Sequence, residues 1–225
     1  MDIMQAMKER HSVRSYTDQA ITGTVKEELE SFVSECNAES GMHMQLILNE
    51  PNAFTGGMAH YGNFQNVKNY IALVGPKESD LDEKAGWFGE KVVLKAQGLG
   101  LNTCWVAMTF NKSKTVCDIL PGEKLALIIS IGYGTTQGVP HKSKPASAVM
   151  KSETLVPEWF QKGIEAALLA PTALNQQKFS FIRQGDTNKV SAKAGIGFYT
   201  KIDLGIAKYH FELGAGKENF VWAER

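Results

Sequence analysis

The residues with the clearest chemical potential lie near the amino terminus, in the segment Arg10-His11-Ser12-Val13-Arg14. In an extended chain, side chains alternate with a period of two, so Arg10, Ser12 and Arg14 would point to one side. Two guanidinium groups and a hydroxyl on one side suit an anion such as phosphate, or a polarised carbonyl edge, because each guanidinium can donate paired hydrogen bonds. The alternative is a charged segment that is simply solvated, and both interpretations stay open on these residues alone.

A second polar segment runs from Ala170 to Gln177, between an apolar helical stretch and a predicted strand. Pro171 is expected to end the helix. Thr172, Asn175 and Gln177 then present a hydroxyl and two amides in a short turn. An amide suits a flat heterocycle because it offers a hydrogen-bond donor and an acceptor together. The alternative is an ordinary polar loop between a helix and a strand.

Two further segments could approach a ligand with their backbone or their charge. Gly98 and Gly100 are expected to end a helix. The strand that follows would bring its backbone close to a ligand at Val106, Ala107 and Met108. Lys142 and Lys144 follow another strand and a glycine-rich turn, and they place two ammonium groups two residues apart; a solvated basic loop is the alternative here.

Signatures of several other enzyme classes are missing. The glycine-rich stretch at 132–138 only partly matches a dinucleotide-binding fingerprint, because its last glycine comes one residue late and Pro140 follows in place of a helix. Cys36, Cys104 and Cys117 have neither metal-ligand spacing nor a neighbouring His, so we expect no disulfide framework and no metal. Phosphate-binding P-loop, zinc-protease, serine-hydrolase and EF-hand spacings are also absent.

Composition indicates an ordinary globular protein. The 225 residues include 24 Lys and Arg against 24 Asp and Glu, and 43% of them are hydrophobic. This balance provides no basic surface for nucleic acid, so we expect no nucleic-acid partner. The sequence contains no export signal and no apolar run of about 18 residues. We therefore expect a cytoplasmic protein without a membrane partner.

The elements that must position these segments alternate between helices and strands. Helices are predicted at about 25–37, 80–98 and 112–119, the first capped by Thr22 or Thr24, and strands at 44–48, 70–74, 105–108 and 125–131. After residue 145 a helix near 154–161 with Thr154 as its cap, a strand at 178–183 and a helix at 202–214 follow in similar order. This order predicts an internal duplication with halves of about 1–145 and 146–225. The alternative is that such an order recurs by chance in a chain of helices and strands.

Taken together, the four segments resemble the motifs of the FMN-dependent nitroreductase family. The resemblance rests on Arg-x-Ser-x-Arg at 10–14, Gly-Leu-Gly before Trp105, Lys-x-Lys-Pro at 142–145 and the Asn-containing turn at 170–177. It covers most of the chain. It implies an α+β fold, a three-layer α/β/α arrangement with a mixed, mainly antiparallel central sheet.

The position of the turn departs from the family pattern. In other members it comes soon after the first helix, whereas here residues 36–41 lack it and it appears at 170–177. Family dimers build each flavin pocket at the subunit interface, so the resemblance implies a fused, internally duplicated unit of residues 1–225. Such a chain would be a monomeric pseudo-dimer or a homodimer. Thr172 replaces the usual Ser, and Lys178-Phe179 replaces the usual Pro-Trp.

The resemblance also implies a role for each candidate residue. The FMN phosphate would be held by Arg10, Ser12, Lys142 and Lys144, with help from the backbone of His11. Arg14 would lie at the N1 and O2 edge of the flavin, where a positive charge favours reduction. Flavin N5 would be lined by the backbone of Val106, Ala107 and Met108. The pyrimidine or ribityl groups would contact Pro171, Thr172, Asn175 and Gln177.

The implied function is reduction of nitroaromatics, quinones or a similar small acceptor by NAD(P)H, through FMN and in alternating half-reactions. Two alternatives stay open: a flavin destructase-like enzyme, which fragments reduced FMN with oxygen, and a non-catalytic flavin-binding or sensor protein. The loop at 51–66, which contains Phe54, His60 and Tyr61, is a candidate lid or acceptor pocket. An ordinary mobile surface loop is the alternative for it.

Overall fold

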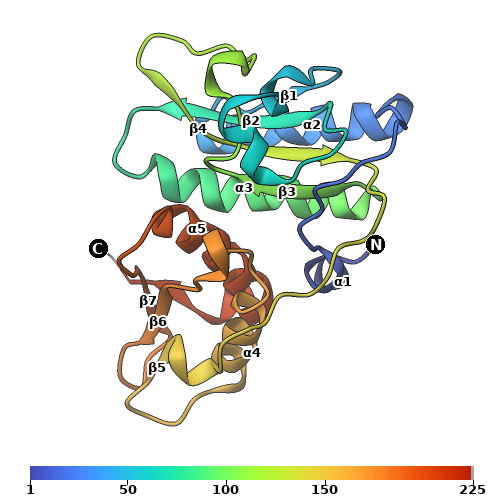
Figure 1. Cartoon of the computed structure of the whole chain (residues 1–225). Helices are drawn as coiled ribbons and strands as arrows, with labels where there is room; N and C mark the ends of the chain where they lie inside the picture. The colour runs from blue at the N-terminus through green and yellow to red at the C-terminus, as the bar shows by residue number, and fades with distance from the viewer. Residues whose placement is uncertain (224–225) are drawn as a thin grey trace. The chain divides into compact units, whose positions relative to one another are not determined.

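A computed structural model describes residues 1–223, which form two compact units, each with its own four-stranded sheet (Figure 1). Unit 1 comprises Met1–Leu81 and Lys91–Pro140. Unit 2 comprises Asp82–Glu90 and the described residues from His141 onward. No helix in the described part of the chain is long and apolar enough to cross a membrane.

The sheet of unit 1 is antiparallel throughout, with the strand order β1-β2-β4-β3. Its strands β2 and β4 are apolar and almost completely buried at their centres. The elements that contribute to this unit are α1 (Ile3–Glu9), α2 (Gly23–Ser40), β1 (Gln45–Ile47), β2 (Tyr70–Pro76), part of α3 (Leu81–Gly98), β3 (Asn102–Val106) and β4 (Glu123–Gly132).

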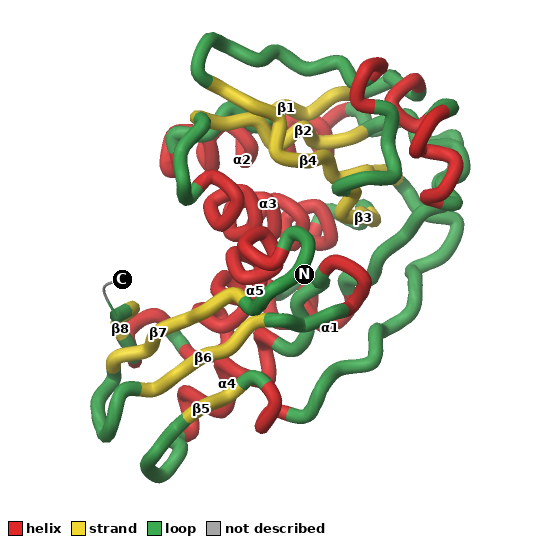
Figure 2. The backbone as a smooth tube through the Cα atoms, turned by 60° about the vertical axis from the view of Figure 1, so that its left-hand side comes forward, coloured by secondary structure: helices red, strands yellow, loops and turns green. Residues whose placement is uncertain are grey.

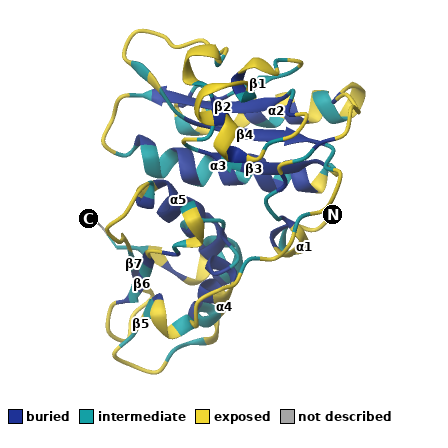
Figure 3. Ribbon diagram, viewed as in Figure 1, coloured by how far each residue is buried: buried dark blue, intermediate teal, exposed yellow. Residues whose placement is uncertain are grey.

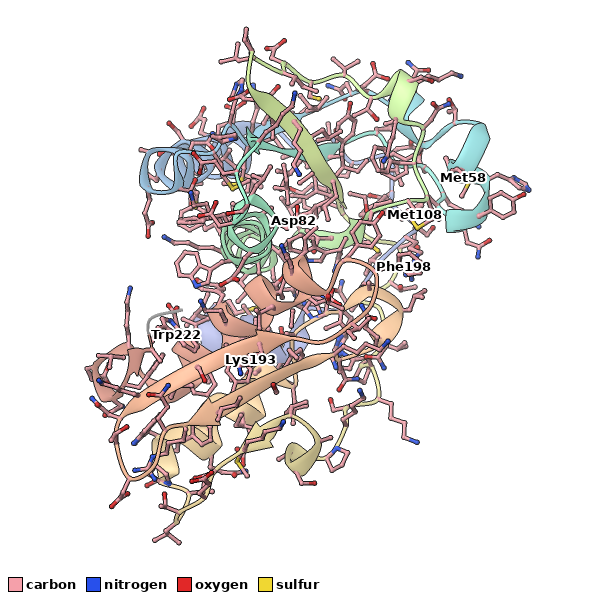
Figure 4. All side chains as sticks on the ribbon, turned by 90° about the vertical axis from the view of Figure 1, so that its left-hand side faces the viewer. Met58, Asp82, Met108, Lys193, Phe198 and Trp222 are labelled. Atoms are coloured by element: carbon pink, nitrogen blue, oxygen red, sulfur yellow. The ribbon has the colours of Figure 1, made fainter. Side chains whose placement is uncertain are left out.

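Helices cover one face of this sheet and loops cover the other. Helix α2 and the Lys91–Gly98 part of α3 lie side by side on one face (Figures 2 and 4), joined by ion pairs from Lys91 to Glu39 and from Lys95 to Glu28. On the other face, alternate residues of the strands pack against the loops after β1 and β3. This second core consists of Ala53, Tyr70, Ala72, Val74, Val106, Phe110 and Ile128, with Phe54 and Phe64 at its edge.

Unit 2 has a mixed sheet with the order β5-β6-β7-β8. The pairs β5/β6 and β7/β8 are parallel, and β6/β7 is antiparallel. Helices α4 and α5 lie on one face of it (Figure 2), where Phe181 of β6 stacks on Phe211 of α5 at 4.6 Å between ring centroids. The elements are β5 (Met150–Lys151), α4 (Glu158–Ala167), β6 (Phe179–Arg183), β7 (Lys189–Ala194), α5 (Thr200–Ala215) and β8 (Val221–Trp222).

Helix α5 is mostly buried (Figure 3) because the Asp82–Glu90 part of α3 also packs against it within unit 2. Gly86 and Gly205 allow the two helices to touch, since a Cβ at Gly205 would meet the carbonyl oxygen of Glu83 and lie 2.8 Å from the backbone nitrogen of Trp87. A buried hydrogen bond of 2.9 Å between His210 Nε2 and Glu90 Oε1 joins the same two helices.

The α+β class and the mainly antiparallel pairing are confirmed: among the described strands, four neighbouring pairs are antiparallel and two are parallel. The strands are divided between two sheets, however, and do not form one central sheet. The two sheets also differ in the direction of their pairings. The duplication of halves at 1–145 and 146–225 therefore stays a prediction.

One predicted helix is wrong. Residues 112–119 contain only a single 3₁₀ turn at Lys112–Lys114. The β-branched residues that follow favour extended backbone, and neighbouring strands hold that backbone: Val116 N donates to the Tyr70 hydroxyl at 2.8 Å, and Asp118 N donates to Gln45 Oε1 at 2.8 Å.

The predicted caps also differ from the structure. Thr22 occupies the cap position of α2, but its side chain makes no capping hydrogen bond. Thr154 lies outside α4, which begins after Pro157, and its hydroxyl donates to the carbonyl of Gly185. The short helix α1, capped by the Asp2 carboxylate, was not predicted.

Candidate functional site

The arginine segment, residues 10–16, is extended and lies along β3 in unit 1. Ser12 pairs with Thr103 in a parallel bridge, and Val13 N donates to the Thr103 carbonyl at 3.0 Å. The backbone of the segment is therefore fixed by the same strand that leads to residues 106–108.

Three polar residues of this segment, Arg10, Ser12 and Arg14, affect the thiol of Cys104 in β3. Burial raises the pKa of the Cys104 thiol, while the positive charges of Arg14 and Arg10 and a hydrogen bond with Ser12 act in the opposite direction. The environments of the two arginines differ, because Arg10 is only 3% exposed whereas Arg14 is exposed to solvent. A freely solvated charged segment is thus ruled out for Arg10. Cys104 was not predicted as a site residue.

A buried tyrosine and several glycines hold the arginine segment in place. The Tyr16 hydroxyl donates to the Val13 carbonyl at 2.7 Å and lies 2.8 Å from Ser130 Oγ, and burial raises the pKa of Tyr16. A Cβ at Gly132 would lie 2.8 Å from the Tyr16 ring, and one at Gly138 would lie 2.7 Å from Cβ of His11. The glycine-rich stretch that partly matched a dinucleotide fingerprint therefore makes room for the arginine segment.

Residues 106–108 begin at the end of β3. Val106 is the last strand residue and is buried, whereas Ala107 and Met108 belong to the loop that follows. The strand thus begins earlier than the predicted 105–108, at Asn102, and ends two residues earlier, at Val106. Met108 is 53% exposed.

The loop at 51–66 is anchored to the loop after β3. Asn111 N donates to the Ala53 carbonyl at 2.7 Å, and Asn111 Nδ2 donates to the Thr55 carbonyl at 3.0 Å. A Cβ at Gly62 would lie 3.0 Å from Cβ of Thr109, so the two loops are in close contact. Figure 4 shows Met58 and Met108 at this place. A role of the loop as a lid or acceptor pocket stays a prediction.

In unit 2 the Asn turn, residues 171–177, is bound to the basic segment, residues 141–145. The carbonyl of Lys142 accepts hydrogen bonds from Asn175 Nδ2 and from Gln177 Nε2, each at 2.9 Å. Gln177 Oε1 accepts from the backbone nitrogen of Lys144 at 2.8 Å, and Lys144 Nζ donates to the Gln176 carbonyl at 2.7 Å. The structure therefore brings two of the predicted segments together.

Within these two segments, some side chains hydrogen-bond inside the turn and others are exposed to solvent. Gln177 is buried, and its Nε2 also donates to Asn175 Oδ1 at 2.7 Å, so its amide holds the turn in shape. Thr172 Oγ1 accepts from Gln177 N at 3.0 Å. Lys142, Lys144 and Asn175 are exposed, and Pro171 and Thr172 are half-buried. A ligand can therefore reach these five residues more readily than the buried Gln177.

The backbone of the Asn turn is strained. Leu174, Asn175 and Gln177 have φ angles of 53°, 52° and 43°, in the left-handed region that non-glycine residues seldom adopt. Leu174 is also 95% exposed, so its side chain gains nothing from burial. Strain of this kind collects at functional sites, where surrounding contacts enforce it.

One of those contacts comes from Asp203 of α5, which was not predicted as a site residue. Its carboxylate accepts from Ala173 N at 2.9 Å and from Gln176 Nε2 at 2.8 Å. Burial raises the pKa of Asp203 to about 6, although these hydrogen bonds lower it. The available signal was an acidic residue between two apolar residues, Ile202 and Leu204, at the start of the predicted helix.

The predicted site residues thus form two sets. Unit 1 holds Arg10, His11, Ser12, Arg14, Val106, Ala107 and Met108, all on or beside β3, and unit 2 holds Lys142, Lys144, Pro171, Thr172, Asn175 and Gln177. In the described part of the chain, no group of three or more His, Cys, Asp or Glu side chains could hold a metal ion.

Comparison with known proteins found both a matching family model and similar solved structures. A family model described as "Putative TM nitroreductase" matches residues 2–215. A solved structure of a "putative nitroreductase" from Thermotoga maritima is 24% identical, has a TM-score of 0.69, and is matched over 97% of this chain and 85% of its own. A search of curated proteins found no match.

Two further solved structures share the fold at lower similarity. A "putative nitroreductase in complex with FMN" from Desulfovibrio desulfuricans is 18% identical, with a TM-score of 0.53 over 70% of this chain and 99% of its own. A "putative NADH dehydrogenase/NAD(P)H nitroreductase" from Bacteroides thetaiotaomicron is 14% identical, with a TM-score of 0.50 over 65% and 95%.

Proposed function

The chain belongs to the nitroreductase family, whose model matches it over residues 2–215, and from this premise we propose that it is an FMN-dependent NAD(P)H oxidoreductase. The observation that carries the proposal is the buried guanidinium of Arg10 on an extended segment it shares with Ser12 and Arg14. The names of two structural relatives, one in complex with FMN and one described as an NAD(P)H nitroreductase, support the choice of cofactor and reductant.

The residues of the arginine segment fit the phosphate end of FMN. A phosphate monoester carries about −1.5 to −2 charges at neutral pH and has three acceptor oxygens. Arg10 supplies a buried, permanently charged donor fork, and Ser12 adds a hydroxyl on the same segment. The backbone pairing with Thr103 holds both residues in place before a ligand arrives.

The lysines of the basic segment, Lys142 and Lys144, have hydrogen-bond donors available for an anion. Lys142 is exposed. Lys144 Nζ donates to the carbonyls of Gln176 and Gln177, and an ammonium has three donors, so one remains. We propose that these two lysines bind a phosphate group.

The remaining candidates suit the ring of the flavin. Arg14 is exposed, and its fixed charge would stabilise negative charge at the N1 and O2 edge. Thr172 and Asn175 lie in a turn whose backbone is held by Gln177 and Asp203. The backbone at 106–108 would face N5. None of these groups acts as a general acid or base, so their part is to bind and orient.

Bound FMN would supply the redox chemistry, taking a hydride from NAD(P)H and passing it to a nitroaromatic, a quinone or a similar small acceptor in two alternating half-reactions. The test is the visible spectrum of the purified chain, followed by addition of NAD(P)H and then of a nitroaromatic without oxygen. The proposal predicts a yellow protein that bleaches rapidly and recovers on addition of the acceptor.

Other outcomes would replace the proposal. A flavin that stays oxidised on a stopped-flow timescale would indicate a binding or sensor protein. Formation of dimethylbenzimidazole from FMN in air would indicate a flavin destructase. A protein that binds no FMN would overturn the proposal altogether.

A further inference from the structure

Asp203 is a buried carboxylate in the first turn of α5, only 2% exposed. A buried carboxylate is costly unless hydrogen-bond donors surround it. Both of its oxygens accept hydrogen bonds from the Asn turn: Oδ1 from Ala173 N at 2.9 Å and Oδ2 from Gln176 Nε2 at 2.8 Å. Asp203 is therefore in direct contact with the turn at two points.

These two points enclose the strained part of the turn. Leu174 and Asn175, both with positive φ, lie between Ala173 and Gln176. A left-handed conformation costs about 1–2 kcal/mol for a residue such as Leu174, although Asn tolerates it better, so the turn needs contacts that enforce it. Asp203 fixes the backbone on one side of the strained pair and a side chain on the other.

Gln176 extends this contact to a second loop. Its Nε2 also donates to the carbonyl of Phe198 at 2.7 Å. The loop at 195–199 ends at Tyr199, again with a positive φ of 59°, and the Tyr199 carbonyl accepts from Asp203 N at 2.9 Å. Phe198 itself is 77% exposed, at the position labelled in Figure 4. Asp203 thus connects the Asn turn with the loop that precedes its own helix.

We propose that Asp203 is the positioning residue of the Asn turn: it holds Thr172 and Asn175 in the arrangement that receives the flavin. The inference rests on the proposed function, because FMN is the ligand it names. Asp203 acts through the turn, since it is only 2% exposed and its oxygens accept from Ala173 N and Gln176 Nε2.

The test compares Asp203→Ala, Asp203→Asn and Val190→Ala by titration with FMN, followed through quenching of flavin fluorescence. Alanine removes both acceptors. Asparagine keeps one oxygen for Ala173 N but turns an amide toward Gln176. Val190 is a fully buried residue of β7, so its truncation controls for lost stability of unit 2. Thermal unfolding of each variant without FMN fixes a temperature at which all are folded.

We expect D203A to weaken FMN binding about tenfold or more, as for loss of hydrogen bonds to a charged group, and D203N to recover a substantial part of the affinity. V190A should bind like the wild type. Equal FMN affinity in D203A and the wild type, or equal weakening in D203A and V190A, would overturn the inference.

Amide hydrogen exchange without FMN separates this inference from the proposed function. D203A should speed exchange at residues 172–177, and V190A should not. If the wild type bound no FMN, the proposed function would fall, and faster exchange in D203A would still support positioning of the turn by Asp203. Unchanged exchange in D203A would overturn the positioning role whatever the ligand.

Discussion

The crossing of α3 and α5 within unit 2 gives the sharpest stability prediction. The three atoms nearest to a Cβ at Gly205 are all backbone atoms of α3: it would meet the Glu83 carbonyl oxygen and lie 2.8 Å from Trp87 N and 3.0 Å from the Glu83 carbonyl carbon. Backbone atoms cannot rotate away as a flexible side chain can. Gly205→Ala therefore forces the two helices apart.

The cost follows from what this separation disturbs. Overpacking alone costs about 1–3 kcal/mol. The separation also lengthens the buried hydrogen bond between His210 and Glu90, now 2.9 Å, and the ion pair between Lys208 and Glu83, now 2.8 Å. Removing one partner of a buried ion pair costs about 3–5 kcal/mol. Lengthening these two interactions loses part of that free energy, which adds to the cost of overpacking. We expect G205A to lower the free energy of unfolding by about 3 kcal/mol or more.

Urea denaturation followed by circular dichroism measures this change. Gly98→Ala is the matched control, because Gly98 ends α3 in unit 1 and a Cβ there meets nothing within 4 Å. Alanine has the higher helix propensity, so G98A should be neutral or more stable by up to about 1 kcal/mol. Equal stability of G205A and the wild type would refute the close crossing of the helices.

Three other predictions concern the two candidate sets. Arg14→Ala should slow reduction by NAD(P)H at saturating FMN far more than it weakens FMN binding; stopped-flow bleaching and an FMN titration separate the two effects, and equal modest changes would undo the assignment of Arg14. Burial raises the pKa of Asp203 from 3.8 to about 6, so the folded chain retains a proton that the unfolded chain has released between these values. The free energy of unfolding should therefore fall by about 2 kcal/mol as the pH rises from about 4 to 6, and Asp203→Asn should remove this slope; parallel curves for the two proteins would contradict it. Leu174→Asn should raise the free energy of unfolding by about 0.5 kcal/mol, because Asn tolerates a positive φ and the Leu174 side chain loses no burial; a clear destabilisation in urea would argue against strain in the turn.

The parts of the fold that could be predicted are those with long apolar patterns. Helix α3 and strands β2 and β4 were found because their apolar residues recur over many positions. The predicted helix at 112–119 failed because distant strands, through Tyr70 and Gln45, bind its backbone. Contacts of this kind leave no trace in the local sequence.

In the candidate site, too, contacts with distant parts of the chain decide features of single residues that the local sequence does not show. The period of two placed Arg10, Ser12 and Arg14 along one extended segment, and the structure confirms the extended backbone. The sequence pattern could not show that Arg10 is buried while Arg14 is exposed. Arg10 directly follows α1, a helix that was not predicted. Asp203 was missed because its partners in the Asn turn lie about thirty residues earlier in the chain.

The central claim, that the arginine segment binds the phosphate of FMN, is tested most directly by comparing FMN with riboflavin, which lacks the phosphate. Calorimetric titration of both into the wild type and into Arg10→Ala and Arg10→Lys isolates the phosphate contribution. The account predicts that the wild type prefers FMN by about 100-fold or more, that R10A loses most of this preference and that R10K keeps part of it. Equal affinity of the wild type for both flavins, or an FMN preference unchanged in R10A, would contradict it.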